Sequence, residues 1–293
     1  MKKIVIIFLL VLLGCNTNTG KKETIIIKGS DTMVNLSKIW AIEFMKQYPN
    51  ISVQINGGGS GTGIAALLNN TGQIANVSRE LKQSETKKAK LHNLIIKKHI
   101  VALDAIAIIV NKNNKIDSLD FYQLKQIFTG KINNWKQLGG SSAKITLFGR
   151  ENSSGTYEFV KNVILNNSNE NTNYDFDSST QVLQGTSSLA EAIAGDVSAI
   201  GYGSLGYFAK RNDVKIIKIK KNKTDIAVNL IQHKQINYKY IWNGNYPLAR
   251  YLYCFTTSFN NNAVIKYINF VKSQNGQKLV KEMEYIPLTY ANK

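Results

Sequence analysis

Most of the chain repeats one pattern of hydrophobic and polar positions: a short apolar run, a polar turn, and a segment whose apolar residues recur three and four positions apart. The first such unit has an apolar run at 24–28, a polar turn at 29–32 and a helical period at 33–47. Short apolar runs predict β-strands, and helical periods predict amphipathic helices. Further strands are predicted at 51–55, 74–77, 99–110, 145–148, 199–203, 214–219 and 251–257, and further helices at 64–68, 84–91, 117–128, 157–165, 189–194, 263–273 and 276–283. Strands that alternate with helices indicate an α/β fold with mixed, largely parallel sheets flanked by helices.

Four polar turns follow predicted strands and can therefore meet in space. They lie around Ser30, Ser60, Ser78 and Ser154. In open α/β sheets ligands bind at the carboxyl ends of the strands, so we expect these turns to line one cleft. Three turns come from the first third of the chain and one from its middle, which places the cleft between two lobes.

The length of the chain allows two modest lobes with cores of their own, because it has 293 residues of which 43% are hydrophobic. We expect the first lobe to contain residues 24–104 and 227–293, and the second to contain residues 105–226. The chain would then cross between the lobes near Leu103 and near Pro247. Two such crossings would act as a hinge.

The turn at 150–156 has the residues that an anion site needs. Ser154, Gly155 and Thr156 lie where a helix begins, and the first backbone N–H groups of a helix are unpartnered and carry the positive end of its dipole. The hydroxyls add donors, the glycine lets a ligand approach the backbone, and Arg150 offers a planar fork of donors for a tetrahedral oxyanion. The alternative is an ordinary Ser/Thr helix cap with a turn glycine.

The glycine-rich turn at 57–63 also leads into a helix and is another candidate anion cradle. It is not a Walker loop, since no Gly-Lys-Ser/Thr ends it, and it is not a hydrolase nucleophile elbow, because Thr62 stands where a glycine is needed. The turn before the helix at 33–47 has the same design, with Ser30 or Asp31 as the expected N-cap. This repetition favours anion binding over simple capping at each turn.

The net charge of +18 is compatible with anionic partners in general. Basic residues are not interleaved with stacking aromatics, and no recognition motif is present, so we exclude nucleic acid as a partner. Only four of the 37 basic residues are arginines. Arg79 and Arg150 lie beside Ser, Gly and Thr clusters and are therefore more informative than the total charge.

The first 15 residues are typical of an export signal, with two lysines before an apolar run at 4–13 that is too short to span a membrane. The Leu-Leu-Gly-Cys sequence that ends at Cys15 resembles the lipobox of bacterial lipoproteins, in which cleavage leaves a lipidated cysteine at the N-terminus. The alternative is an ordinary signal with a chance cysteine. Residues 16–23 would form a tether. Cys254 lies in an apolar strand, so we expect it to be buried and not to act as a nucleophile.

The order and spacing of these turns resemble the PstS-like family, the substrate-binding lipoproteins of ABC phosphate importers. The resemblance covers nearly all of the chain after the signal, in Gly29–Thr32, Gly58–Ile64, Ser78–Glu80, Leu124–Trp135, Arg150 with Ser154–Thr156, Ala199–Tyr202, Tyr246–Leu248, Gly276–Lys278 and Tyr285–Leu288. It implies a two-lobed, hinged periplasmic-binding-protein fold that closes on one inorganic phosphate in the interlobe cleft. It also implies an extracytoplasmic protein that delivers phosphate to the permease of the importer, without a catalytic residue, a cofactor or a metal.

The resemblance further implies the ligands of the phosphate. They are Ser30, Thr32, Ser60, Gly61, Ser78, Arg79, Arg150, Ser154, Gly155 and Thr156. One departure matters, because the well-studied branch has an acidic residue at the position of Arg79. There the carboxylate accepts the proton of HPO4²⁻ and repels sulfate. Asp31, Glu80 and Asp104 are candidates for the acceptor here, with Asp31 preferred; the alternative is that all three are caps or surface carboxylates.

Other functions stay open at this point: a broader, sulfate-like oxyanion binder, a lipid-anchored interaction protein, or, with less support, a phosphatase. The three histidines, His92, His99 and His233, are far apart in the sequence and form no ligand-spaced cluster, so a metal site is not predicted. Ser60 and Ser154 have no visible base that would make them nucleophiles. We expect a monomer without enzymatic activity.

Overall fold

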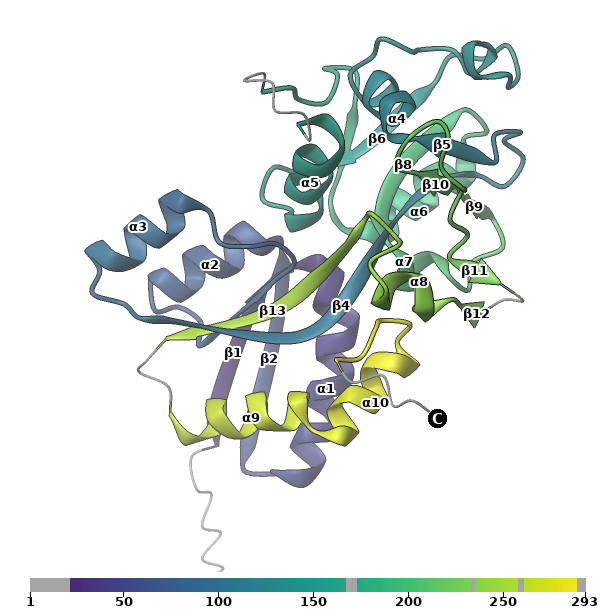
Figure 1. Cartoon of the computed structure of the whole chain (residues 1–293). Helices are drawn as coiled ribbons and strands as arrows, with labels where there is room; N and C mark the ends of the chain where they lie inside the picture. The colour runs from purple at the N-terminus through teal and green to yellow at the C-terminus, as the bar shows by residue number, and fades with distance from the viewer. Residues whose placement is uncertain (1–21, 167–172, 233–234, 258–260, 289–293) are drawn as a thin grey trace, which may run out of the picture.

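Two long strands organise the molecule. The computed structural model describes residues 22–166, 173–232, 235–257 and 261–288. Strands β4 (Ile96–Asn111) and β13 (Ala249–Thr257) lie side by side and run from one half of the molecule into the other (Figure 1). The main sheet has the order β2-β1-β3-β13-β4-β8-β6-β7, and β9 also pairs with β4. The predicted α/β class with a mixed sheet is confirmed.

The first half has three layers. Its sheet contains β1 (Glu23–Gly29), β2 (Ile51–Gly58) and β3 (Ile74–Val77), all parallel, followed by the antiparallel β13 and β4. Helices α1 (Val34–Gln47), α9 (Asn262–Lys272) and α10 (Gln274–Glu282) cover one face, and α2 (Ser60–Leu68) and α3 (Gln83–Leu91) cover the other (Figure 1).

The side chains of β13 show why both faces of this sheet are covered. Leu252 and Cys254 point into the core beneath α1 and α9, whereas Tyr253 and Phe255 point into the core beneath α2 and α3. Successive residues of a strand point to opposite faces, so an uninterrupted apolar strand needs a partner on each side. Cys254 is buried and its Sγ donates to Asn76 Oδ1 at 3.2 Å; burial raises the pKa of its thiol to about 12. The prediction of a buried cysteine is confirmed, and a buried thiol with a raised pKa is poorly suited to act as a nucleophile.

The second half continues the sheet through β8, which is antiparallel to β4 and parallel to β6. A large core of its own lies between these strands and the surrounding helices. Its elements, in chain order, are β5 (Ser118–Asp120), α4 (Phe121–Phe128), η2 (Trp135–Leu138), β6 (Thr146–Arg150), α5 (Gly155–Val160), the π-helix η3 (Lys161–Leu165), β7 (Gln181–Leu183), α6 (Gly185–Gly195), β8 (Ala199–Ser204), α7 (Leu205–Phe208), β9 (Val214–Ile216), β10 (Lys218–Lys220), β11 (Ile231–Gln232), β12 (Gln235–Ile236) and α8 (Tyr238–Trp242).

The packing places the second crossing at β13. Leu230, Ile236, Ile241 and Leu248 belong to the core of the second half, so the segment before β13 packs with that half rather than with the first. The chain therefore crosses close to Pro247, where the second crossing is expected, although the residues between the expected boundary at 227 and β13 pack with the second half. The division into two lobes that move as units stays a prediction.

Several predicted elements have different limits. Residues 118–120 are not helical, because they pair with β10, and the predicted strand at 214–219 is two strands, because β9 pairs with β4 and β10 with β5. Helices α2, α5 and α6 begin at Ser60, Gly155 and Gly185, which is four, two and four residues earlier than predicted. The polar turns are thus the first turns of the helices themselves.

The N-terminal predictions fall on residues that the structure does not describe. The export signal, Cys15 and nearly all of the tether lie before residue 22. The described residues contain no helix with the length and apolar character needed to cross a membrane.

Candidate functional site

Five buried hydroxyls converge where the two halves meet. Ser30, Thr32, Ser60 and Ser78 come from the first half and Thr156 from the second, and each is at most 3% exposed; we call them the hydroxyl cluster. Ser30 Oγ donates to Ser78 Oγ at 3.0 Å, Ser60 Oγ lies 3.3 Å from Ser78 Oγ, and Thr32 Oγ1 lies 3.1 Å from Thr156 Oγ1. The sequence prediction that these turns meet is confirmed by this geometry.

The sheet topology explains the convergence. Strands β1, β2 and β3 are adjacent and parallel, so their carboxyl ends lie at one edge, where Ser30, Ser60 and Ser78 follow them within two residues. The turn after β1 is held in place by two tyrosines: the hydroxyl of the part-buried Tyr207 donates to the carbonyl of Asp31 at 2.9 Å, and that of the buried Tyr285 donates to the carbonyl of Thr32.

Glycines let the second half approach this edge closely. A Cβ on Gly155 would lie 2.3 Å from Ser60 Oγ and 2.4 Å from Ser78 Oγ, which is closer than atoms can pack. Gly59 has a φ of +88°, which glycine adopts readily, and a Cβ there would lie 2.5 Å from the carbonyl oxygen of Ser153. The Gly61 N–H donates to that same carbonyl at 3.0 Å. Backbone from both halves is therefore in direct contact around the hydroxyl cluster.

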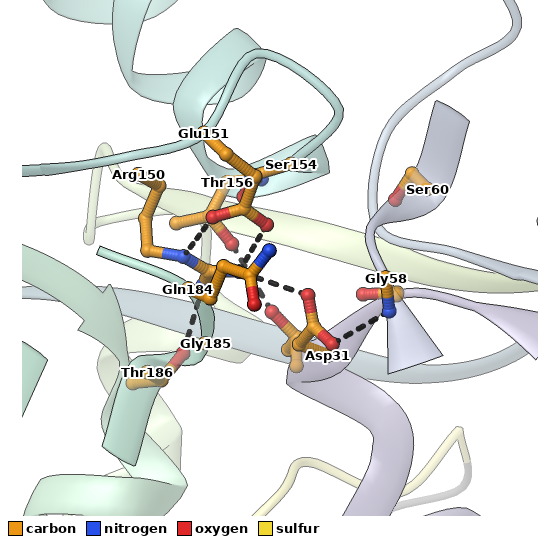
Figure 2. A network of polar contacts seen from close by, with 12 residues as sticks. Asp31, Gly58, Ser60, Arg150, Glu151, Ser154, Thr156, Gln184, Gly185 and Thr186 are labelled. Atoms are coloured by element: carbon orange, nitrogen blue, oxygen red, sulfur yellow. Dashed lines mark hydrogen bonds and ion pairs between the residues drawn. The ribbon is translucent and has the colours of Figure 1, made fainter. Parts of the chain in front are cut away.

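Arg150 joins the two halves from the end of β6. Figure 2 shows its guanidinium between Glu151, Thr186 and Asp31. Nη2 donates to Asp31 Oδ2 at 3.0 Å and to Glu151 Oε1 at 2.9 Å, Nε donates to Glu151 Oε2, and Nη1 donates to Thr186 Oγ1 at 3.1 Å. Asp31 in turn accepts from the Gly58 N–H at 2.9 Å. Two carboxylates thus compensate the charge of Arg150, and both oxygens of the preferred proton acceptor, Asp31, are engaged.

Ser154 is the N-cap of α5. Its Oγ accepts from the N–H groups of Thr156 and Tyr157 at 3.1 and 3.3 Å. The capping alternative for this serine therefore has direct structural support. Because the cap uses only the acceptor side of the hydroxyl, its proton remains available to an anion.

The side chains of two other candidates are engaged with partners outside the hydroxyl cluster. The guanidinium of Arg79 is paired with Glu85 at the start of α3, with contacts of 2.7 and 2.8 Å, and donates to its neighbour's carbonyl. Glu80 is a surface carboxylate that accepts from Tyr253 Oη at 2.5 Å and from Lys98. These contacts give Arg79 the role of fixing α3, and we leave it out of the ligand set proposed below.

Sequence reasoning did not include Arg250 among the site residues. Its Nη2 donates to Thr32 Oγ1 at 3.1 Å and to Thr156 Oγ1 at 3.0 Å, so it touches the hydroxyl cluster from both halves. Nε and Nη2 also donate to Asp104 Oδ2, at 3.1 and 2.8 Å, and Ser204 donates to Asp104 Oδ1 at 2.6 Å. Burial raises the pKa of Asp104, and Arg250 and Ser204 oppose this shift.

The sequence did contain a signal for this pair. Asp104 and Arg250 interrupt the two long apolar strands, and they are direct register partners in the antiparallel pair β4–β13. Charged residues are rare in buried strands, and those that occur are usually paired or serve a function.

Possible metal ligands do not gather in the part of the chain that the structure describes, where no three His, Cys, Asp or Glu side chains are grouped. His233 lies outside that part. His92 is the C-cap residue that follows α3, and His99 lies on β4 with its Nε2 3.0 Å from Thr256 Oγ1.

Comparison with known proteins identifies the family. The model of the PBP superfamily domain matches residues 16–275. The phosphate-binding protein PstS of Pseudomonas aeruginosa is 31% identical over 277 residues, which cover 89% of this chain and 81% of that protein. This chain belongs to the PstS-like family of the PBP superfamily. The PstS of Bacillus subtilis is 30% identical over 280 residues and supports the same assignment, with 94% of this chain and 85% of that protein covered.

Solved structures of similar proteins share the two-lobed fold. A putative phosphate ABC transporter substrate-binding protein from Clostridium perfringens, solved with bound phosphate, has a TM-score of 0.77 and 27% identity, and covers 91% of this chain and 100% of its own. A phosphate transport receptor from Vibrio cholerae has a TM-score of 0.69 and 28% identity over 89% of this chain and 99% of its own. The PstS-like chain is therefore a substrate-binding protein and not an enzyme, which removes the phosphatase alternative.

Proposed function

We propose that this PstS-like chain captures inorganic phosphate between its two halves and delivers it to the permease of an ABC importer. The observation that carries the proposal is the hydroxyl cluster, in which buried donors from three strand ends of one half meet Thr156 and Gly155 of the other. The proposed ligands are the members of this cluster together with Gly61, Arg150, Ser154 and Gly155. The names of the Pseudomonas and Bacillus relatives, and the phosphate bound to the Clostridium protein, support phosphate as the anion.

The energetic requirement supports a site of this kind. A dianion that leaves water needs many compensating donors, because burial of an uncompensated charge is prohibitive. Each hydrogen bond to a charged group contributes ~1.5–3 kcal/mol net, so about eight of them would give micromolar or tighter binding after the cost of closure. Hydroxyls suit this task because each can donate to the anion while it accepts from a neighbour.

The experiment is calorimetric titration of phosphate-stripped protein, first with phosphate and then with sulfate. Micromolar or tighter phosphate binding without sulfate heat is the expected result. Equal binding of both anions would favour the broader oxyanion function. That outcome would agree with the structure of Asp31, because both of its carboxylate oxygens already accept hydrogen bonds from the protein. Absence of binding for both would overturn the proposal and favour an interaction protein.

We further propose that the protein is extracytoplasmic, monomeric and held at the membrane by a lipid on Cys15. The support is the lipobox-like sequence and the apolar run before it. Stable anchoring needs more than one acyl chain, as a diacylated N-terminal cysteine provides. Replacement of Cys15 by alanine should move the protein from the membrane fraction to the soluble fraction of cells, and unchanged fractionation would contradict the anchor.

A further inference from the structure

The charged groups around the hydroxyl cluster are not equivalent. Arg150 contacts two carboxylates, Asp31 and Glu151, with N–O distances of 3.0 and 2.9 Å, so its charge is more than compensated. Arg250 is paired with a single carboxylate, Asp104, at 2.8 Å. Of these two arginines, Arg250 therefore has more unused capacity to compensate an incoming anion.

Arg250 also has an unused donor group. Its side chain is 3% exposed, yet Nη1 has no hydrogen-bond partner within the described part of the chain. Among the buried side-chain atoms without a partner in the described ranges, Nη1 is the only one that belongs to a charged group. A buried cationic donor without an acceptor is costly, and such a group in a native structure calls for an explanation.

The position of Arg250 brings this unused donor next to the hydroxyl cluster. Its neighbouring nitrogen, Nη2, lies 3.1 Å from the Thr32 hydroxyl and 3.0 Å from the Thr156 hydroxyl. Both hydroxyl oxygens can accept from the guanidinium, and because one hydroxyl donates to the other at 3.1 Å, the proton of the second is left for a further acceptor. The ring of Phe159 lies 5.5 Å from the guanidinium carbon, so an apolar group covers the cation on that side.

We propose that Arg250 is a direct ligand of the bound anion, to which Nη1 donates, and that Asp104 is the positioning residue that holds the guanidinium in place. This inference rests on the proposed phosphate function and identifies Arg250 as a buried cation that contacts the phosphate. Arg250 lies on the crossing strand β13 and contacts Thr32 of the first half and Thr156 of the second. An anion bound to Arg250 would therefore link this strand to both halves.

The test compares variants by calorimetric titration with inorganic phosphate. Removal of Arg250 alone would leave Asp104 buried and unpaired, so the principal variant is the double substitution Arg250→Gln with Asp104→Asn, which removes both charges. We expect its phosphate affinity to fall at least about 100-fold, as the loss of charge-assisted hydrogen bonds requires. Arg250→Lys, which keeps the charge but not the planar fork, should recover part of this loss.

The matched control is Arg211→Gln. Arg211 pairs with Glu191 and Asp213 on the surface of the second half, and its replacement should leave phosphate affinity unchanged. A folded double variant that binds phosphate within about threefold of the wild type would overturn the inference. Failure of the wild-type protein to bind phosphate would instead refute the proposed function.

A second measurement does not depend on the folding of any variant. A crystal structure of the wild-type protein with phosphate should place Nη1 of Arg250 within hydrogen-bond distance of a phosphate oxygen, about 3.2 Å or less. A separation greater than about 4 Å would exclude Arg250 as a ligand even if its variants bound weakly.

Discussion

At the scale of single residues, Gly155 sets how closely the halves can meet. Its Cβ position is 2.3 and 2.4 Å from the hydroxyl oxygens of Ser60 and Ser78. Gly155→Ala should therefore force the halves apart by about 1 Å, the shift that brings the new Cβ to ordinary contact distance, and weaken phosphate binding about tenfold or more, or ~1.4 kcal/mol, by calorimetry. Gly195→Ala is the control, because it adds the same methyl group at the end of α6 where no atom lies within 4 Å. Equal affinities for the two variants would show that this contact does not limit closure.

The residue scale also shows what sequence reasoning can and cannot find. Ser60, Thr156 and their neighbours could be identified because hydroxyls and glycines at the end of a strand form a local pattern. Arg250 has no such pattern around it, and its contacts with Thr32 and Thr156 span 218 and 94 residues of sequence. Arg79 is the opposite case, since its local sequence suggests a ligand whereas its guanidinium is bound to Glu85.

At the scale of secondary-structure elements, the start of α4 is set both by a local capping box and by the pairing of the preceding residues with a distant strand. Helix α4 begins at Phe121, after Asp120 has paired with Lys220 of β10. Asp120 Oδ1 accepts from the Gln123 N–H at 2.7 Å, and the Gln123 side chain accepts from the Asp120 N–H at 3.0 Å. Asp120→Ala should lower the free energy of unfolding by about 1 kcal/mol, through the loss of this capping box, without a change in phosphate affinity.

Asp117 offers a comparison three residues earlier. It is exposed and pairs only with Lys215 in the described structure, at 2.9 Å, so Asp117→Ala should change the free energy of unfolding by less than about 0.5 kcal/mol. Urea denaturation followed by circular dichroism would separate the two effects. The cap would be shown to be unimportant if both variants unfolded at the same denaturant concentration.

The elements that sequence patterns missed have a common cause. Apolar runs predicted β4 and β13 well, because each is buried along most of its length. The predicted strand at 214–219 is divided because its two parts pair with different strands, β4 and β5. A hydrophobic pattern reports burial, whereas the choice of partner strand depends on residues about 100 positions away, which no local window contains.

At the scale of the whole molecule, the contacts between the halves fall into two classes. Buried or part-buried contacts surround the hydroxyl cluster, as in the Thr32–Thr156 hydroxyl pair and the ion pair of Asp31 with the buried guanidinium of Arg150. An ion pair nearer the surface, Lys82 with Glu158 at 2.7 Å, lies at the rim, where the two side chains are 41% and 23% exposed. The buried class should dominate closure, since exposed ion pairs contribute only ~0–1 kcal/mol.

This difference predicts how the molecule responds to its ligand. Without an anion, the buried donors are stabilised by hydrogen bonds to water when the halves separate. The halves should therefore open about β4 and β13 and close again when phosphate is added. Small-angle X-ray scattering should show a smaller radius of gyration for phosphate-saturated protein than for phosphate-stripped protein. Asp31→Asn, which removes the negative charge paired with Arg150, should weaken this compaction at a given phosphate concentration, whereas Glu158→Gln should leave it nearly unchanged. An identical radius of gyration with and without phosphate, in wild-type protein shown by calorimetry to bind it, would mean that the anion enters a structure that is already closed.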